Sequence, residues 1–162
     1  MQTWSQPDFE QKICPPQELA QRIAALPRPL VFTNGCFDII HRGHVTYLAQ
    51  ARALGECLIL ALNTDESVRR QGKGSDRPIN ALPQRAAVAA ALASVDWVTW
   101  FDSDTPAALI AEIQPDILVK GGDWAVEQIV GSTETLARGG QVHSIPFVHH
   151  TSTTKTLEKI RA

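Results

Sequence analysis

LVFTNGCFDIIHRGH, residues 30–44, is the stretch that decides the fold. Its first residues are apolar and typical of a buried strand, and the residues after His44 are rich in Ala and Leu and favour a helix. The loop between them contains Gly35, His41 and Gly43. A buried strand that passes through a glycine-containing loop into a helix is typical of a parallel α/β sheet, in which such loops bind ligands.

The same alternation continues along the rest of the chain. Apolar segments predict strands at residues 30–33, 57–63, 97–101 and 117–120, with a fifth at residues 141–146. Stretches rich in Ala and Leu predict intervening helices at residues 45–54, 84–94 and 106–114. We therefore expect an α/β protein with a Rossmann-like, doubly wound parallel sheet of five strands and helices on both faces. Residues 71–83 form the long polar loop of this arrangement.

The length of the chain predicts one main domain. A chain of 162 residues with 44% hydrophobic residues can bury a sizeable core. We expect residues 1–29 to form a lead-in with a short amphipathic helix, because Leu19, Ile23 and Leu26 recur at helical spacing before a proline. The domain itself is expected to span residues 30–162.

Composition excludes several classes of protein. The net charge of −2 gives no basic field, so we do not expect nucleic acid as a partner. Cys14, Cys36 and Cys57 form no CxxC pair, which argues against a disulfide framework or a thiolate zinc site and favours a reducing cytoplasm. The N-terminus has no apolar signal segment, and no stretch approaches the roughly 18 apolar residues of a membrane span. We expect a cytoplasmic protein without a membrane partner.

Two histidines in the loop suit phosphate chemistry. His41 and His44 lie three residues apart, so both rings can point to one side of the first helical turn. Gly35 permits a tight exit from the strand, and Gly43 lets a phosphate approach the N–H groups at the helix start. Imidazoles there can donate hydrogen bonds to phosphate oxygens as charge develops. Two other interpretations stay open at this point: a helix cap, and a metal site that adds Asp38 to the histidines.

NGCFD at residues 34–38, followed by HRGH at 41–44, resembles the signature of the cytidylyltransferase-like nucleotidyltransferases of the HxGH superfamily. The resemblance extends over about residues 30–161, with further matches in the same order: NTDESV at 63–68, Arg85, VD at 95–96, KGGDW at 120–124 and STT at 152–154. Within this superfamily, the phrases FTNGCFDIIHRGHVTYLAQAR, KGSDRPIN, ASVDWV and PDILVKGGDW are similar to the heptose 1-phosphate adenylyltransferases of lipopolysaccharide biosynthesis.

The resemblance implies a reaction and the residues that perform it. AMP would pass from ATP, accompanied by Mg²⁺, to D-glycero-β-D-manno-heptose 1-phosphate by in-line attack on the α-phosphate, giving ADP-heptose and pyrophosphate. The implied catalytic residues are His41, His44 and Lys73. The implied nucleotide-binding residues are Asn34, Gly35, Phe37, Gly43, Arg85, Lys120, Gly121, Ser152, Thr153 and Thr154. The implied substrate-binding residues are Asp38, Asp65 and Asp123. A separate heptose kinase and phosphatase would supply the sugar phosphate.

Simpler interpretations accompany these assignments. Lys73 and Arg85 can be exposed cations, Lys120 and Gly121 can belong to a plain turn, and Asp65 and the STT run can be helix N-terminal residues. Relatives that use CTP often carry Arg-Thr a few residues before the STT run, where this chain has Phe147 and Val148. Cytidylyl transfer to a polyol or aminoalcohol phosphate is therefore the second candidate, and a non-catalytic nucleotide-binding module is the third. A homo-oligomer is compatible with each of them.

Overall fold

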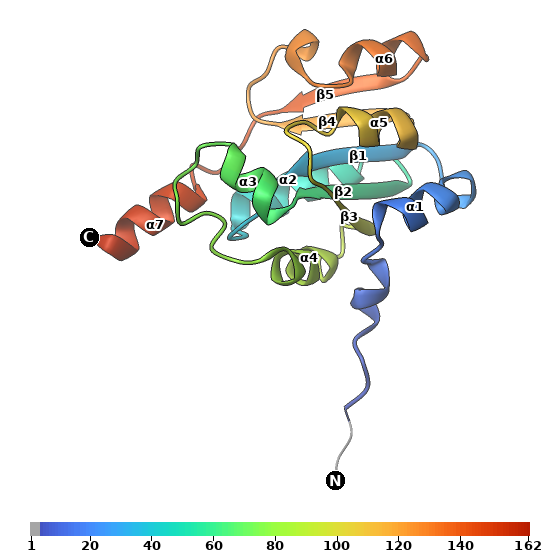
Figure 1. Ribbon diagram of the computed structural model, residues 1–162. Helices are drawn as coiled ribbons and strands as arrows, with labels where there is room; N and C mark the ends of the chain where they lie inside the picture. Colours follow the sequence, from blue (N-terminus) through green and yellow to red (C-terminus); the bar gives the residue numbers. More distant parts are fainter. Residues whose placement is uncertain (1–3) are drawn as a thin grey trace.

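A five-stranded parallel sheet in the order β3-β2-β1-β4-β5 forms the centre of the molecule (Figure 1). The computed structural model describes residues 4–162. The strands are β1 (Leu30–Gly35), β2 (Cys57–Asn63), β3 (Trp97–Phe101), β4 (Ile117–Gly121) and β5 (Gln141–Ile145). Because the chain moves outward from β1 to β3 and then crosses to β4 beside β1, the strand order reverses between β1 and β4. The predicted α/β class, the five parallel strands and the doubly wound order are confirmed.

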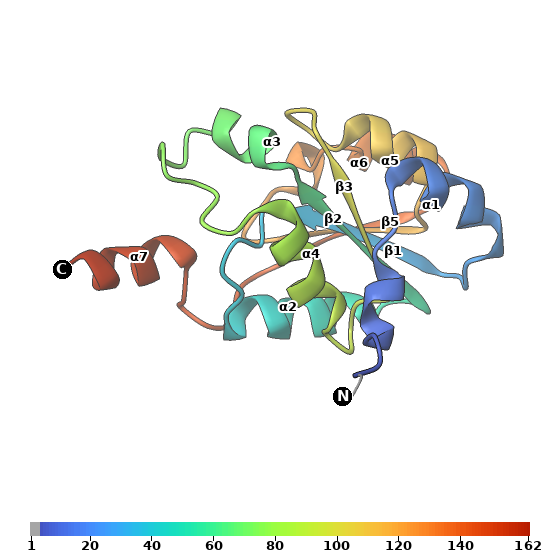
Figure 2. The same ribbon diagram turned by 60° about the horizontal axis from the view of Figure 1, so that its bottom comes forward.

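Helices cover both faces of this sheet, as Figure 2 shows. The α-helices are α1 (Pro16–Arg22), α2 (Arg42–Arg52), α3 (Asp65–Arg70), α4 (Leu82–Ala90), α5 (Ala107–Ile113), α6 (Ser132–Ala137) and α7 (Thr153–Arg161). Short 3-10 helices occur at η1 (Asp8–Lys12), η2 (Ile23–Ala25) and η3 (Val126–Gln128). Helices α2 and α4 pack on one face, and α1 and α5 pack on the other. The prediction of helices on both faces is confirmed.

Strand β2 explains why the sheet is so apolar. All seven of its residues are buried, because helices lie on both sides of it. Leu58, Leu60 and Leu62 face the core under α2 and α4, whereas Ile59 and Ala61 face the core under α1 and α5. The period of two along one strand therefore supplies both cores at once.

The helix boundaries differ from the predicted ones in ways that matter for the site. Helix α2 begins at Arg42, three residues before the predicted start at 45, because His41 is its N-cap. Helix α4 covers Leu82–Ala90 instead of residues 84–94. Helices α3 and α6 were not predicted, because each has only six residues and too few turns for a periodic pattern.

The N-terminal segment packs against the edge strand β3. The N–H of Cys14 donates to the carbonyl oxygen of Val98 at 2.9 Å, and Ile13 forms a parallel bridge with the same strand residue. Lys12 donates to the Val95 carbonyl at 2.8 Å, and Leu19 is fully buried. These contacts cover the backbone of an exposed sheet edge.

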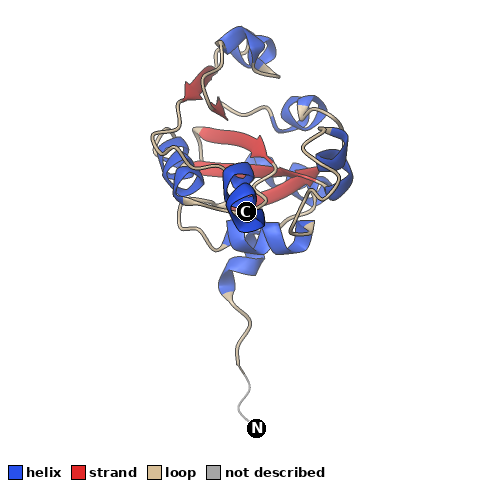
Figure 3. Cartoon of the chain, turned by 90° about the vertical axis from the view of Figure 1, so that its left-hand side faces the viewer, coloured by secondary structure: helices blue, strands red, loops and turns tan. Residues whose placement is uncertain are grey.

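Helix α7 projects from the body at the carboxyl side of the sheet, as Figure 3 shows end-on. None of its nine residues, all of them described, is buried. An ion pair between Arg161 and Asp76 ties its far end to the loop between α3 and α4. Within residues 4–162, no helix has the length and apolar character that crossing a membrane requires.

Candidate active site

A cavity of about 590 Å³ opens at the carboxyl ends of β1 and β4, where the strand order reverses. This is the position where open α/β sheets bind their ligands. Most of the predicted site residues line it: Asn34, Gly35, Phe37, Asp38, His41, His44, Lys73, Lys120, Gly121, Ser152, Thr153 and Thr154. Four predicted residues are not among its lining residues: Gly43, Asp65, Arg85 and Asp123. The fold thus gathers residues from four separate sequence motifs into one cavity.

The two histidines lie against each other at the start of α2. Their rings stack with centroids 3.8 Å apart and planes inclined by 19°. The His41 N–H donates to Nδ1 of His44 at 3.4 Å, so in the neutral His44 ring the proton sits on Nε2. Nδ1 of His41 lies 3.1 Å from Oγ1 of Thr151. These contacts hold both rings in defined orientations beside the free N–H groups of the helix start.

Burial keeps these histidines neutral. It lowers the pKa of His41, and it lowers the pKa of His44 to about 4, with smaller contributions from the charges of His41 and Lys73. Phe37 contributes to this dry environment, because its ring centroid lies 4.9 Å from that of His44. At neutral pH His44 therefore carries one N–H donor and no charge. A neutral donor needs no counter-ion before an anionic substrate arrives.

Gly43 lies behind the histidine pair instead of facing the open cavity. A Cβ atom at this position would lie 3.0 Å from Cε1 of His41 and 3.3 Å from Oγ1 of Thr151. The glycine therefore makes room for the His41 ring and its threonine partner. A backbone contact between Gly43 and phosphate stays a prediction.

Asp38 anchors the long polar loop. Its buried carboxylate accepts hydrogen bonds from Nε of Arg77 at 2.7 Å, from the N–H of Ile79 at 2.7 Å and from the N–H of Asn80 at 2.8 Å. Burial alone would raise the pKa of Asp38, but the N–H donors of Asn80 and Ile79, together with Arg77, outweigh burial and lower it. These three donors occupy both oxygens, so in this conformation Asp38 positions the loop. Its predicted contact with the sugar stays a prediction.

Arg85 and Asp65 form a second pair that holds loops in place, as Asp38 and Arg77 do; we call each such pair a brace. The Arg85 side chain is fully buried and donates to Asp65 at 2.7 Å, to the Cys36 carbonyl at 2.8 Å and to the Asn80 carbonyl at 2.9 Å. Asp65 also accepts the N–H of Leu82 at 2.9 Å, at the start of α4. The brace holds the loop after β1 against the polar loop. Direct contacts of Arg85 with phosphate and of Asp65 with the sugar would require these side chains to leave their present partners.

Two lysines bring positive charge into the cavity. Nζ of Lys73 lies 3.2 Å from Sγ of Cys36, to which it donates a hydrogen bond. Lys120 is half-buried at the end of β4, and burial, followed by repulsion from Lys73, lowers its pKa. A phosphate placed near both amino groups would relieve this repulsion. Asp123 lies beyond them on the exposed loop after Gly121, so its contact with substrate stays a prediction.

The hydroxyl-rich start of α7 faces residues 34–44, which we call the histidine loop. Ser152 is the N-cap of this helix, and its side chain accepts the N–H of Lys155 at 3.1 Å. Oγ1 of Thr153 donates to the carbonyl oxygen of Ile39 at 3.2 Å. The predicted helix cap is therefore present, and the same residues line the cavity. Free N–H groups at such a helix start favour an anion.

Several lining residues were not predicted from the sequence. They are Cys36, Tyr47, Gly72, Arg77, Phe147 and Thr151. Tyr47 could have been found, because it lies one helical turn after His44 and therefore on the same face of α2. Cys36 also lines the cavity, and its thiol contacts Lys73. Nothing in the local sequence around Arg77 indicates that it pairs with Asp38.

The arrangement does not favour the metal-site interpretation. The Asp38 carboxylate is taken by Arg77 and two backbone N–H groups, and the two histidines stack on each other. Among residues 4–162, no group of three or more His, Cys, Asp or Glu side chains is placed to hold a metal ion. Asp38 therefore lacks a free oxygen to act as third ligand.

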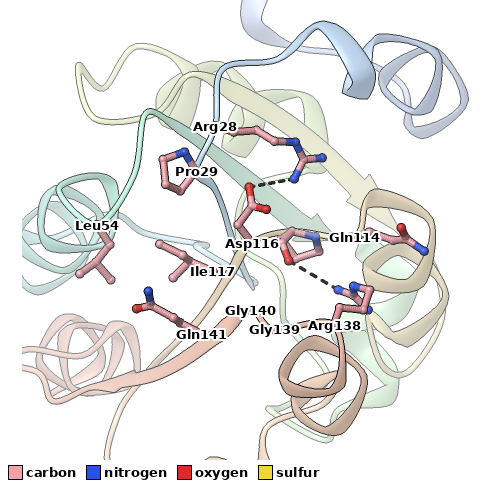
Figure 4. Close-up of a pocket in the computed structure, with 11 residues that line it drawn as sticks. Arg28, Pro29, Leu54, Gln114, Asp116, Ile117, Arg138, Gly139, Gly140 and Gln141 are labelled. Carbon is pink, nitrogen blue, oxygen red and sulfur yellow. Dashed lines mark hydrogen bonds and ion pairs between the residues drawn. The ribbon is translucent and has the colours of Figure 1, made fainter.

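A second cavity, of about 700 Å³, lies at the opposite end of the strands (Figure 4). Its charged side chains contact other residues of the same lining: Nη1 of Arg28 lies 2.8 Å from Oδ2 of Asp116, and Nη2 of Arg138 lies 3.5 Å from the Pro115 carbonyl oxygen. None of the predicted site residues, all within the described range, lines this cavity. It offers no pair of histidines and no hydroxyl-rich helix start.

Comparison with known proteins shows the family to which the chain belongs. The chain belongs to the cytidylyltransferase-like family, whose sequence model matches residues 32–158. It is similar to the D-beta-D-heptose 1-phosphate adenylyltransferase of Bordetella bronchiseptica, with 56% identity over 155 residues that cover 94% of this chain and 96% of that protein. It is also 55% identical over 130 residues to the bifunctional protein HldE of Marinomonas sp., of which it spans only 27%, while the match covers 80% of this chain.

Solved structures share the fold. The lipopolysaccharide core biosynthesis protein of Thermoplasma volcanium superposes with a TM-score of 0.60 and 26% identity, over 75% of this chain and 98% of that one. The pantoate-beta-alanine ligase of Francisella tularensis superposes with a TM-score of 0.55 and 14% identity, over 83% of this chain and 66% of that one. The second likeness shows the fold alone.

Proposed function

We propose that this chain transfers AMP from ATP to D-glycero-β-D-manno-heptose 1-phosphate and releases pyrophosphate and ADP-heptose. The observation that carries the proposal is the cavity in which the stacked pair of His41 and His44 meets Lys73 and the hydroxyl-rich start of α7. The Bordetella relative is named for the same activity and aligns with nearly the whole chain.

The reaction needs positioning and charge stabilisation more than proton transfer. The sugar phosphate is already an anion at neutral pH, so its oxygen can attack the α-phosphorus without a general base. Charge then builds on the α-phosphate oxygens and on the leaving pyrophosphate. His41 and His44 donate hydrogen bonds to the α-phosphate oxygens. Lys73 and the N-terminal N–H groups of α7 stabilise the charge on the pyrophosphate. The braces formed by Asp38 and Arg85 keep these donors in place.

Mg²⁺ enters this proposal as part of the substrate. Asp38 supplies the carboxylate that lines the cavity. It already accepts three hydrogen bonds, so the described lining residues provide no ready carboxylate ligand for Mg²⁺. Magnesium ions bound to nucleotides take many of their ligands from phosphate oxygens and water. We therefore assign the metal to the ATP complex and not to a resident protein site.

The proposal also places the chain among other enzymes. A separate heptose kinase and a phosphatase would supply the required 1-phosphate, and all three activities would operate in the cytoplasm. The product would supply activated heptose for lipopolysaccharide biosynthesis. No nucleic acid or membrane partner is assigned.

A pyrophosphate-release screen tests the proposal directly. The purified chain is incubated with each of the four nucleoside triphosphates and with a panel that includes heptose 1-phosphate, other sugar 1-phosphates and glycerol 3-phosphate. Release with ATP and heptose 1-phosphate, with ADP-heptose found by mass spectrometry, is the expected result. Release with CTP and an alcohol phosphate alone would establish the cytidylyltransferase instead, and nucleotide binding without turnover would indicate a binding module.

A further inference from the structure

Phe147 places a large, partly exposed aromatic ring in the lining of this cavity. It follows β5, lines the cavity and is 45% exposed, although most of the other lining side chains are polar or small. Exposure of a large apolar ring to water is unfavourable, and an exposed aromatic side chain inside a ligand cavity is a candidate contact surface. The mechanism described above does not use it.

The structure holds this ring by its edge. Its centroid lies 5.7 Å from that of Tyr47, with the two planes inclined by 68°. A Cβ atom on Gly121 would lie 2.8 Å from Cζ and 3.1 Å from Cε1 of Phe147, so the ring edge rests against the backbone of Gly121. Tyr47 is in turn buried and fixed on α2. These contacts fix the orientation of the ring, and its exposed part is available to a stacking partner.

We propose that Phe147 is the platform on which the adenine ring of ATP stacks, an inference that rests on the proposed function. Phe147 lies five residues before Ser152, and the start of α7 is where the phosphates are proposed to bind. A nucleotide with its phosphates there can extend its base toward the ends of β4 and β5. A purine has a flat π-face that stacks on aromatic side chains, whereas a heptose is a polyol without such a face.

Phe147 thus determines specificity in one respect: it distinguishes a nucleotide, which carries a base, from a phosphate compound without one. Stacking on an aromatic ring favours large purine rings over small ones, but it reads no hydrogen-bonding pattern. We therefore expect Phe147 to strengthen the binding of ATP and to leave the binding of compounds without a base unchanged.

The test compares Phe147→Ala with Phe147→Trp, and uses Val148→Ala as the matched control. Val148 is the neighbouring residue, is also exposed and does not line the cavity. Three quantities are measured on each variant: the Kd for ATP by calorimetry without sugar phosphate, the Ki of inorganic tripolyphosphate, and KM for heptose 1-phosphate. Phe147→Ala should weaken ATP binding by about tenfold, as the loss of one stacked base predicts. Its other two constants should stay within about twofold of wild type, and Phe147→Trp should restore ATP affinity.

Three results would overturn the inference. Unchanged ATP affinity in Phe147→Ala would show that the ring carries no base. Equal weakening of ATP and tripolyphosphate would show that Phe147 only shapes the start of α7. A loss confined to heptose 1-phosphate would place the ring at the sugar. Because ATP binding is measured without the second substrate, failure of the proposed function would appear separately, as absent turnover in the wild-type chain.

Discussion

The two ends of the sheet carry cavities of similar size but opposite chemical character. At the carboxyl ends of β1 and β4, two neutral histidines, two lysines and a hydroxyl-rich helix start face the open cavity. At the amino ends, Arg28 pairs with the exposed Asp116, and Arg138 contacts a backbone carbonyl. Cavity volume alone would therefore favour the amino end, whereas the chemical groups that line the two cavities favour the carboxyl end. The difference lies in where the charged groups find their partners.

At the carboxyl end, the residues that hold the loops in place differ from the residues proposed to bind the phosphates. Asp38 and Arg85 are buried, and their partners belong to the protein, so they hold loops. Lys73 lies on the polar loop, His41 and His44 lie at the start of α2, and all three line the cavity. At the amino end, the same side-chain types pair at the surface, where an ion pair contributes little stability. Three perturbations and one mapping experiment test this difference between the two ends.

The largest effect on activity is expected for the histidines. Replacing His41 or His44 by Ala would remove one of the donors proposed for the α-phosphate, and loss of such a donor costs about 3 kcal/mol, or roughly a hundredfold in kcat. KM for ATP should change much less, because the contact strengthens chiefly in the transition state. Steady-state kinetics checks this, with Arg138→Ala in the other cavity as the control that keeps its kcat. Reduced kcat in Arg138→Ala with normal kcat in both histidine variants would place the chemistry at the amino end.

The second effect concerns stability. Asp38→Ala leaves Arg77 buried without its partner and two N–H groups without an acceptor, so the free energy of unfolding should fall by about 3–5 kcal/mol. Arg28→Ala removes an exposed ion pair and should cost less than about 1 kcal/mol. Urea unfolding followed by circular dichroism measures both. Similar losses for the two variants would contradict the distinction between buried brace and surface pair.

The smallest effect is a dependence of stability on pH. The pKa of His44 is about 4 in the folded chain and about 6.5 when unfolded, so the unfolded chain binds more protons between these values. The stability that this histidine contributes is fully present above pH 6.5 and is lost as the pH falls toward 4; His41 acts in the same direction. Urea midpoints from pH 7.5 to 4.5 should fall in the wild type and fall less in His44→Gln. Parallel curves would show that His44 titrates normally.

Much of this architecture could be predicted from residues 30–63. The buried strand, the glycines and the histidine spacing indicate the sheet, the loop and the helix that follows, because each depends on local pattern. The supporting roles of Asp38 and Arg85 could not be predicted, because Arg77 lies 39 residues from Asp38 and the Cys36 carbonyl lies 49 residues from Arg85. The local sequence presents both as charged residues in a functional motif. Only the folded chain shows that their hydrogen bonds end on Arg77 and on the Cys36 carbonyl.

Hydrogen exchange with mass spectrometry can map the end of the sheet at which ATP is proposed to bind. The chain is compared with and without α,β-methylene ATP and Mg²⁺, so that the nucleotide binds without reacting. We predict slower amide exchange in residues 34–44 and 151–156, which carry the histidine loop and the start of α7, and unchanged exchange in residues 114–117 and 138–141 around the second cavity. Protection of residues 114–117 and 138–141, with none in the histidine loop or at the start of α7, would contradict the assignment of the active site to the carboxyl ends of β1 and β4.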